Sequence, residues 1–329
     1  MKEPHLILGI GELLWDILPA SGQLGGVPIE EAETADEEPS TQAARVALLG
    51  GAPANFTVMA GRLGSHAAIL SRIGRDNLGR LAIDKLDPLP VDTSRLEIDA
   101  KHATGRVTVS FEGGQPRYTI HEPAAWDFLE LTDDWVQLAE RADAICFGSL
   151  AQRRAPSRQT IQTLAAQTRA SCIRVFDVNL RPPFISGEVI EESLELATVV
   201  KMNEDELPQV LQLLGQNGDS PQLRSGAERL LAEFPSLQLV AITRGNRGSV
   251  LVSREAWDDH PGFPVKMADG IGAGDAFTAA LTHYLLRGAP LATLNEAGNR
   301  WGGWVASQSG AMPALPDEVR AAIAAAIEQ

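Results

Sequence analysis

Short apolar runs alternate with amphipathic stretches along most of the chain. Six apolar runs have the length and continuous hydrophobicity of strands buried on both faces, and they span residues 5–11, 142–150, 173–179, 199–203, 237–243 and 249–253. Between them, apolar residues recur at helical spacing, most clearly over residues 53–63, 133–141, 157–169, 188–197, 205–214 and 222–234. This order predicts an α/β fold with a central, mainly parallel sheet flanked by helices.

Ligands of such sheets bind beyond the carboxyl ends of the strands. That rule directs attention to the polar residues that follow the predicted strands, which lie at 12–16, 148–149, 179–181, 203–206 and 244–248.

A hairpin interrupts the alternation at residues 103–120. Val107, Val109 and Phe111 alternate with polar residues, and a turn follows at 112–115. A two-stranded hairpin is marginal alone, so it must pack on something. We expect a small β-sheet that acts as a lid.

An acidic segment at residues 23–46 carries few apolar residues. Two interpretations are open, a solvated or disordered loop and a flap near the substrate mouth, and the composition favours the loop.

Composition and charge limit the partners and the location that we expect for this chain. A chain of 329 residues with 44% hydrophobic content can bury a large core, and its formal net charge of −15 makes nucleic acid a poor partner. The first apolar run is too short for a signal peptide or a membrane span. Cys146 and Cys172 lie in apolar runs as expected of buried thiols, so a cytoplasmic location fits.

The most informative segment is Asp-Gly-Ile-Gly-Ala-Gly-Asp at residues 269–275, directly before a helical pattern. Backbone amides of Gly272, Ala273 and Gly274 at a helix N-terminus could stabilise charge on a transferring phosphoryl group. Asp275 could accept the proton of an attacking hydroxyl. The alternative is that Asp275 merely caps the helix. Neither a Walker loop nor a dinucleotide fingerprint is present.

Two segments resemble the signatures of the ribokinase-like (PfkB) carbohydrate kinases. Gly-Gly-Ala-Pro-Ala-Asn at 50–55 is similar to the N-terminal signature, and residues 269–277 to the C-terminal one. Further blocks follow in family order at 71–79, 103–109, 177–184, 201–206, 243–249 and 299–316. The resemblance implies one ribokinase-like kinase domain over 1–329, with a lid from parts of about 12–50 and 100–122.

The resemblance implies ATP and Mg²⁺ as partners in catalysis. Asp275 would be the base, and the amides of residues 272–274 the anion hole. Asn203 and Glu206 match an Asn-x-x-Glu element that orders Mg²⁺ through water. The alternative is a helix-capping Asn with a surface Glu. Asp269 is a candidate ligand of a monovalent cation such as K⁺, although Gly270 replaces the usual Thr.

For the nucleotide, the resemblance implies Thr243, Gly245 and Gly248 near the phosphates and ribose. These glycines also suit a tight turn between two strands. Asn299 matches a position near the adenine, or it simply faces solvent on its helix.

For the sugar, Asp16 and Asn55 are the leading candidates, because a carboxylate and an amide together accept from and donate to hydroxyls. Gly50 and Gly51 would let the backbone approach the sugar ring. The alternative for Asn55 is a helix cap.

Arg181 could hold either a phosphate or a sugar oxygen. Trp15 and Trp126 could stack on a sugar or fill the interface under the lid, and core packing is the commoner fate of Trp.

The segments at 11–19, 49–56 and 122–129 resemble the fructokinase-like branch, which implies fructose and ATP giving fructose 6-phosphate. Other small sugars and nucleosides remain open: ribose, 2-keto-3-deoxygluconate, another ketose, or adenosine. A non-catalytic sensor on the same fold is an alternative of another class. A redox enzyme is disfavoured by the missing fingerprint. A homodimer through the lid is a further expectation.

Overall fold

The computed structural model describes residues 4–19, 27–29, 45–112, 115–216 and 222–327. An eight-stranded sheet forms its centre, in the order β15-β14-β13-β12-β11-β10-β1-β5. The strands are β1 (Leu6–Ile10), β5 (His66–Leu70), β10 (Ala144–Gly148), β11 (Ile173–Asp177), β12 (Val199–Asn203), β13 (Leu239–Thr243), β14 (Ser249–Ser253) and β15 (Trp257–His260).

The neighbouring strands β5, β1, β10, β11, β12 and β13 run parallel to one another. Strands β14 and β15 add an antiparallel edge. The predicted three-layer α/β fold is therefore confirmed, and all six predicted strands are present. Strand β1 lies between β5 and β10, so the chain reverses its direction of travel across the sheet there. Ligand sites of open α/β sheets form at such a reversal, at the carboxyl ends of the strands.

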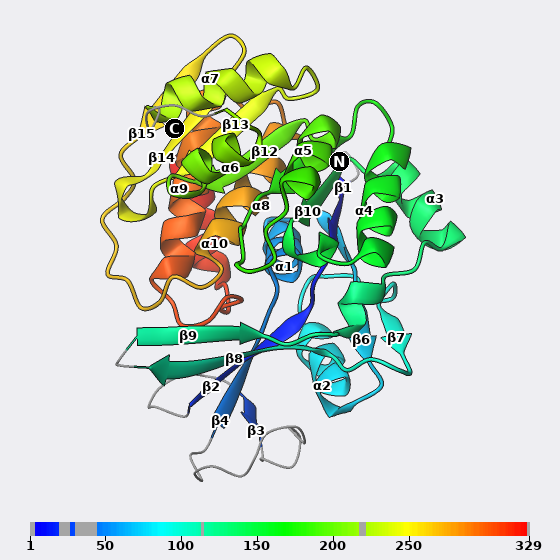
Figure 1. Cartoon of the computed structure of the whole chain (residues 1–329). Helices are drawn as coiled ribbons and strands as arrows, with labels where there is room; N and C mark the ends of the chain where they lie inside the picture. Colours follow the sequence, from blue (N-terminus) through cyan, green and yellow to red (C-terminus); the bar gives the residue numbers. More distant parts are fainter. Residues whose placement is uncertain (1–3, 20–26, 30–44, 113–114, 217–221, 328–329) are drawn as a thin grey trace.

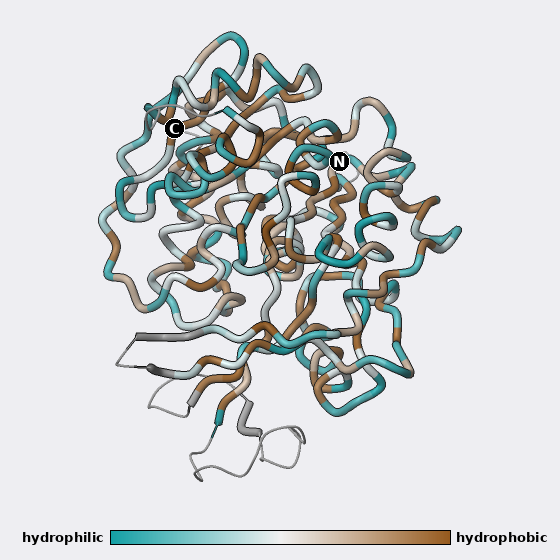
Figure 2. The backbone as a smooth tube through the Cα atoms, viewed as in Figure 1, coloured by the Kyte–Doolittle hydropathy of each residue, from teal (hydrophilic) through white to brown (hydrophobic). Residues whose placement is uncertain are grey.

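Helices cover both faces of this sheet (Figure 1). One layer packs residues of α1 (Ala52–Arg62), α8 (Ala273–Leu285), α9 (Leu291–Ala306) and α10 (Asp317–Ile327) against the sheet. The other layer consists of α3 (Asp133–Arg141), α4 (Ala155–Gln167), α5 (Gly187–Leu196), α6 (Glu206–Leu213) and α7 (Leu223–Glu233). Figure 2 shows hydrophobic segments gathered in the central strands.

A smaller five-stranded sheet lies at one end of the molecule, in the order β3-β4-β2-β8-β9 (Figure 1). Its strands are β2 (Leu14–Pro19), β3 (Val27–Ile29), β4 (Arg45–Gly50), β8 (Gly105–Glu112) and β9 (Gln115–Ile120). The predicted hairpin is confirmed as β8 and β9, with Val107 and Val109 buried. The predicted turn includes residues 113–114, which lie outside the described residues.

The acidic segment is only partly described. Residues 27–29 and 45–46 lie in strands β3 and β4, so the interpretation of 23–46 as a loop is wrong for them. These strands exist because β4 pairs with both β2 and β3 through the backbone, and hydropathy does not report such pairing. Residues 23–26 and 30–44 lie outside the described part of the chain.

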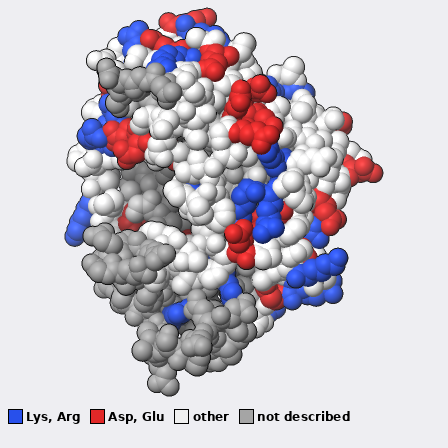
Figure 3. All heavy atoms as spheres, in the orientation of Figure 1, with Lys and Arg blue, Asp and Glu red and all other residues white. Residues whose placement is uncertain are grey.

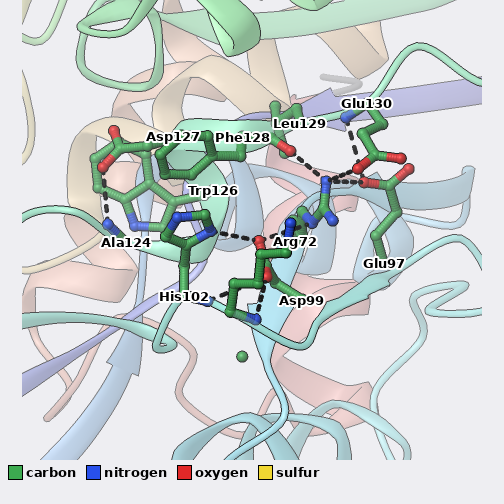
Figure 4. Close-up of polar contacts among 12 residues, drawn as sticks. Arg72, Glu97, Asp99, His102, Ala124, Trp126, Asp127, Phe128, Leu129 and Glu130 are labelled. Atoms are coloured by element: carbon green, nitrogen blue, oxygen red, sulfur yellow. Dashed lines mark hydrogen bonds and ion pairs between the residues drawn. The ribbon is translucent and has the colours of Figure 1, made fainter.

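Two polar clusters anchor the base of the smaller sheet. Thr104, directly before β8, donates from its amide and hydroxyl to Asp76 over 2.7 and 2.6 Å. Beside it, Figure 4 shows Asp99 accepting from His102 Nδ1 over 2.8 Å and pairing with Arg72 over 3.2 Å. The His102 ring stacks on Phe128 with 3.8 Å between ring centroids. The strand β8 therefore begins from a fixed point on the larger part of the molecule.

Several elements were absent from the prediction, among them β5 and β15 of the larger sheet, β6 (Arg72–Gly74), β7 (Glu97–Asp99), α2 (Asn77–Leu86), α9 and α10. Helix α9 shows the physical reason. Its Gly298 faces α8, where a Cβ atom would lie 2.5 Å from a ring carbon of Phe277, so close packing requires a residue with low helix propensity.

On the face in Figure 3, Lys and Arg side chains alternate with Asp and Glu and form no continuous positive surface among the described residues. Within the described part of the chain, none of the helices has both the length and the hydrophobicity that crossing a membrane requires.

Candidate active site

Helix α8 begins at a sharp turn beside the carboxyl ends of β11 and β12. Gly272 is its N-cap, with a left-handed backbone (φ 77°), and a Cβ atom there would lie 2.7 Å from the Ala311 carbonyl oxygen. Only glycine meets both conditions without strain. The amides of the first turn of a helix have no acceptor within the helix, and the helix dipole favours a negative charge at this end.

The three predicted amides are brought together at this N-terminus. Gly272, Ala273 and Gly274 follow one another through the N-cap and the first two helical positions. The Ala273 amide makes a long hydrogen bond of 3.4 Å to the Gly270 carbonyl. The arrangement suits an anion with distributed negative charge, such as a phosphoryl group.

Asp275 occupies the third position of α8. Its Oδ2 accepts a 2.7 Å hydrogen bond from Nδ2 of Asn55, on helix α1. The N-cap is Gly272, and α8 has no side-chain cap, so the interpretation of Asp275 as a simple helix cap is wrong. Burial raises the pKa of Asp275 to about 6, and Asp177 raises it as well, against the opposing effects of Lys201, Asn55 and Arg181. A carboxyl with this pKa is ionised at neutral pH and still basic enough to take a proton.

Of the predicted sugar residues, Asn55 contacts Asp275 directly, and Asp16, Gly50 and Gly51 lie near the start of the helix that carries Asn55. Asp16 lies on β2 next to the end of β4, and a Cβ atom on Gly50 would lie 3.0 Å from Asp16 Oδ2. Gly51 caps α1 with φ 108°, and a Cβ there would lie 2.3 Å from the Glu12 carbonyl oxygen. Asn55 lies inside α1, so the alternative that it caps the helix is wrong.

Arg181 joins this group from the segment after β11. Its side chain is exposed, and its charge lowers the pKa of Asp16, of Glu12 and of Asp275. Burial is the larger effect at Asp16 and raises its pKa to about 6. One cation therefore acts on three carboxyl groups: Glu12 after β1, Asp16 within β2 and Asp275 in the first turn of α8.

Glu12 has no role assigned by the sequence, although it directly follows the first strand. It is 3% exposed, and its Oε1 accepts from the Ala52 amide at the start of α1 over 3.2 Å. Its Oε2 is buried and has no hydrogen-bond partner among the described residues. Burial raises the pKa of Glu12 to about 7, with a smaller contribution from Asp275. The sequence signal for Glu12 was an acidic residue at the end of an apolar run.

Lys201 is the other unassigned residue. It is 7% exposed near the end of β12, and its Nζ lies 3.0 and 3.1 Å from the two carboxylate oxygens of Asp177. A charged residue within a buried strand, two positions before Asn203, was the sequence signal for it.

Asn203 and Glu206 exchange hydrogen bonds at the start of α6. Asn203 Oδ1 accepts from the amides of Asp205 and Glu206, and Glu206 Oε2 accepts from the Asn203 amide. Glu206 Oε1 accepts from the Leu180 amide, and the side chain is 5% exposed. Asn203 is not the N-cap of α6, which is Asp205, although its side chain accepts two amides there, and Glu206 is not a surface residue. Because both of its oxygens already accept amides, it fits a metal held through water better than direct ligation.

The predicted nucleotide residues meet at the turn between β13 and β14. Thr243 pairs with Asn203 across β12 and β13. Gly245 and Gly248 both have positive φ, so the tight-turn interpretation is confirmed, and a nucleotide role is compatible with it. Asn299 is buried and donates 2.7 Å to the Ser249 hydroxyl, so the alternative that it faces solvent is wrong.

Asp269 fastens the segment before α8. Its two carboxylate oxygens accept from the amides of Ile271 and Gly310, over 3.0 and 2.8 Å. Its role toward a monovalent cation stays a prediction. The described residues contain no group of three or more His, Cys, Asp or Glu side chains placed to hold a metal ion.

Both tryptophans considered for the sugar are core residues. Trp15 is 1% exposed and donates 2.9 Å to the Leu78 carbonyl. Trp126 is fully buried, with the Arg153 guanidinium 4.1 Å from its ring centroid. Cys146 and Cys172 are buried thiols, as expected.

The sequence of this chain matches one family model and several known proteins. The family model described as pfkB family carbohydrate kinase matches residues 23–318. A sugar kinase of Pyrococcus horikoshii is 33% identical over 289 residues, which cover 86% of this chain and 83% of that protein. A fructokinase of Klebsiella pneumoniae is 33% identical over 282 residues, covering 81% of this chain and 88% of the relative.

Solved structures give the same result. The Pyrococcus horikoshii sugar kinase in complex with ATP superimposes with a TM-score of 0.74 at 31% identity, covering 93% of this chain and 94% of that one. A fructokinase from Vibrio cholerae O395 with bound fructose, ADP and calcium gives a TM-score of 0.76 at 26% identity, covering 98% of both chains.

The raised pKa of Glu12 predicts a specific dependence of stability on pH. The folded state holds the proton of Glu12 up to about pH 7, whereas the pKa of an exposed Glu is 4.5. Protonated Glu12 therefore makes its full contribution to the free energy of unfolding below pH 4.5. This contribution falls as the pH rises to about 7 and is absent above that pH. Glu12→Gln removes this titration and keeps an acceptor for Ala52.

We expect Glu12→Gln to be more stable than the wild type at pH 8 by roughly 3 kcal/mol, with a much smaller difference at pH 5. Urea denaturation at the two pH values measures this difference. The same substitution at exposed Glu233 should change stability by less than about 0.5 kcal/mol at either pH. An equal effect of Glu12→Gln at both pH values would contradict the assignment.

Proposed function

This chain belongs to the PfkB family of carbohydrate kinases, and within that family we propose that it phosphorylates fructose to fructose 6-phosphate. It is an ATP-dependent carbohydrate kinase. The observation that carries the catalytic assignment is the 2.7 Å hydrogen bond that holds Asp275 beside the open amides of the α8 N-terminus.

In the proposed reaction, a sugar hydroxyl attacks the γ-phosphorus of ATP. The bond from the γ-phosphorus to the β,γ-bridging oxygen breaks, ADP leaves, and the hydroxyl proton passes to Asp275. Asn55 orients Asp275 through the bond to Oδ2, and Oδ1 of the carboxylate would take the hydroxyl proton. The amides of residues 272–274 stabilise charge on the equatorial oxygens of the transferring group.

Fructose is the favoured acceptor because fructokinases recur among the relatives. The Klebsiella pneumoniae relative bears that name, and the Vibrio cholerae structure contains fructose and ADP. In this chain, Asp16 and Asn55 would accept from and donate to sugar hydroxyls, with the backbone of Gly50 and Gly51 giving the ring close access. Arg181 would bind a phosphate oxygen once charge develops, because it faces Asp16 and Asp275 together.

The nucleotide would lie along the β13–β14 turn. Thr243, Gly245 and Gly248 would face its phosphates and ribose, and Asn299 the side of the adenine. Asn203 and Glu206 would hold Mg²⁺ through water, and the ion would neutralise charge on the β- and γ-phosphates. Asp269 would support a K⁺ site indirectly, because its carboxylate orders the segment before α8.

The smaller sheet would act as the lid of this site. It carries Asp16 on β2, and β4 leads through Gly50 into α1. A sugar bound to Asp16 and Asn55 would therefore touch both the smaller sheet and the larger part of the molecule. A homodimer through the exposed face of this sheet is part of the same proposal, since Tyr118 on β9 is 65% exposed there.

A substrate screen tests the proposal. ADP release is measured with MgATP and fructose, ribose, glucose, 2-keto-3-deoxygluconate or adenosine, with and without potassium. We expect fructose to give the highest kcat/KM. Preference for another acceptor would overturn the fructose assignment and retain the kinase. Absence of release with any acceptor, with ATP binding intact, would favour a sensor.

Replacement of the base gives a second prediction. Asp275→Asn should lower kcat by about 10²–10⁴-fold, because the amide cannot take the hydroxyl proton. The binding constant of the sugar, measured by calorimetry, should change by no more than several-fold. Asp317→Asn is the matched control, since Asp317 also lies in the first turn of a helix, α10, and should leave kcat unchanged. Substantial turnover by Asp275→Asn would refute the assignment of the base.

Lid closure gives a third prediction. Addition of fructose should slow amide hydrogen exchange in β8 and β9, because closure removes these strands from solvent. Helix α7 lies at the opposite end of the molecule from the smaller sheet (Figure 1). Its amide exchange serves as the internal control and should not change. Identical exchange of β8 and β9 with and without sugar would argue against a lid.

A further inference from the structure

A buried ion pair lies beneath the first turn of α8. Lys201 Nζ is 3.0 and 3.1 Å from the two oxygens of Asp177, and the two side chains are 9% and 6% exposed. Asp177 ends β11, and its Cα is the register partner of Lys201 on β12. Side chains of a strand alternate between faces, so both residues share the face that α8 covers, as do Val175 and Val199 two positions earlier.

This pair is joined to α8 by two contacts. The single proton of the Thr278 hydroxyl is shared between two acceptors, Asp177 Oδ2 at 3.0 Å and the Gly274 carbonyl oxygen at 2.9 Å, so this hydroxyl places the carboxylate beside the first turn. Lys201 Nζ lies 2.9 Å from the position that a Cβ atom on Gly274 would take. Glycine at 274 therefore leaves the room that the ammonium group occupies.

We propose that Lys201, Asp177 and Thr278 form a clamp that positions the first turn of α8 for phosphoryl transfer. The inference rests on the proposed function, because the amides of residues 272–274 and the Asp275 carboxylate must face one sugar hydroxyl and one phosphoryl group in a fixed register. A displacement of about 1 Å at a reacting group can cost roughly 100-fold in rate. The clamp holds this turn on two adjacent strands of the sheet.

The charges of the clamp also act on Asp275. Asp177 raises the pKa of Asp275 and Lys201 lowers it, so the two partners have opposite effects. Burial lowers the pKa of Lys201, but the nearby Asp177, Asp275 and Glu206 carboxylates outweigh it and keep the ammonium charged. A buried pair that only held the fold could be replaced by apolar groups at little cost. Here the lysine also offsets the other acidic groups of the site.

The remaining groups that face Asp275 come from neighbouring elements and stay constant in the test. They are Asn55 on α1, Arg181 after β11, Glu12 after β1 and the thiol of Cys146 on β10.

Thr278→Val tests the positioning role with the smallest change of shape. It deletes the hydroxyl that joins Asp177 to Gly274 and keeps both charges. Thr282→Val is the matched control: Thr282 is equally buried one turn further along α8, and its hydroxyl donates to the Thr278 carbonyl instead. We expect Thr278→Val to lower kcat by at least about 10-fold, with the KM values of sugar and ATP within about threefold. Thr282→Val should keep the wild-type kcat.

The charge effect is measured on the acid limb of the pH profile of kcat/KM, which reports the pKa of the base in the free enzyme. Lys201→Met removes the cation that lowers the pKa of Asp275, so the acid limb should move to higher pH. Asp177→Asn removes the anion that raises it, so the limb should move to lower pH. A role limited to folding would lower the yield or stability of both variants without opposite shifts.

The inference is overturned if Thr278→Val matches Thr282→Val in kcat, or if the limbs of the two charge variants coincide with the wild type. Should the charge variants fail to fold, the comparison of Thr278→Val with Thr282→Val decides alone. Should the wild type phosphorylate none of the sugars, the proposed function fails separately. Amide exchange at residues 272–276 then decides the clamp, which predicts faster exchange in Thr278→Val than in Thr282→Val.

Discussion

The hydrogen bond between Asn55 Nδ2 and Asp275 Oδ2 joins two helix N-termini that are 220 residues apart in the sequence. Each of these helices starts at a glycine with positive φ, Gly51 for α1 and Gly272 for α8. The two turns let the backbones approach the ends of β1 and the segment around Ala311, where a Cβ atom would collide. The Asn55–Asp275 hydrogen bond thus brings the start of α1, which follows Gly50 of β4, next to the first turn of α8.

Burial of several charged groups is the main electrostatic cost of this arrangement. Burial raises the pKa of Glu12 to about 7 and those of Asp16 and Asp275 to about 6. Lys201 and Arg181 oppose this effect from β12 and from the segment after β11. A site of this kind is less stable than an apolar core would be, and it holds a base whose pKa lies close to neutral pH. The acidic surface of the chain therefore coexists with a centre in which each cation has a defined acidic neighbour.

Most of the fold could be predicted from the sequence because its strands are continuous apolar runs. The glycines at 270–274 predicted the N-terminus of α8, and the order of the motifs along the chain predicted the family. The predictions failed where long-range pairing decides the structure. Strand β4 depends on β2 and β3, and Gly298 of α9 depends on Phe277 across a helix–helix contact. Within the site, no role was predicted for Glu12 or Lys201, because their partners, Ala52 and Asp177, come close to them only in the folded chain.

The most direct test of the account is a crystal structure with MgADP, fructose and aluminium fluoride, which imitates the transferring phosphoryl group. The account predicts the fluoride ligands at the amides of residues 272–274, with the acceptor hydroxyl within hydrogen-bonding distance of Asp275. Fluoride bound away from the α8 N-terminus, or a hydroxyl directed to another carboxylate such as Glu12 or Asp16, would contradict it.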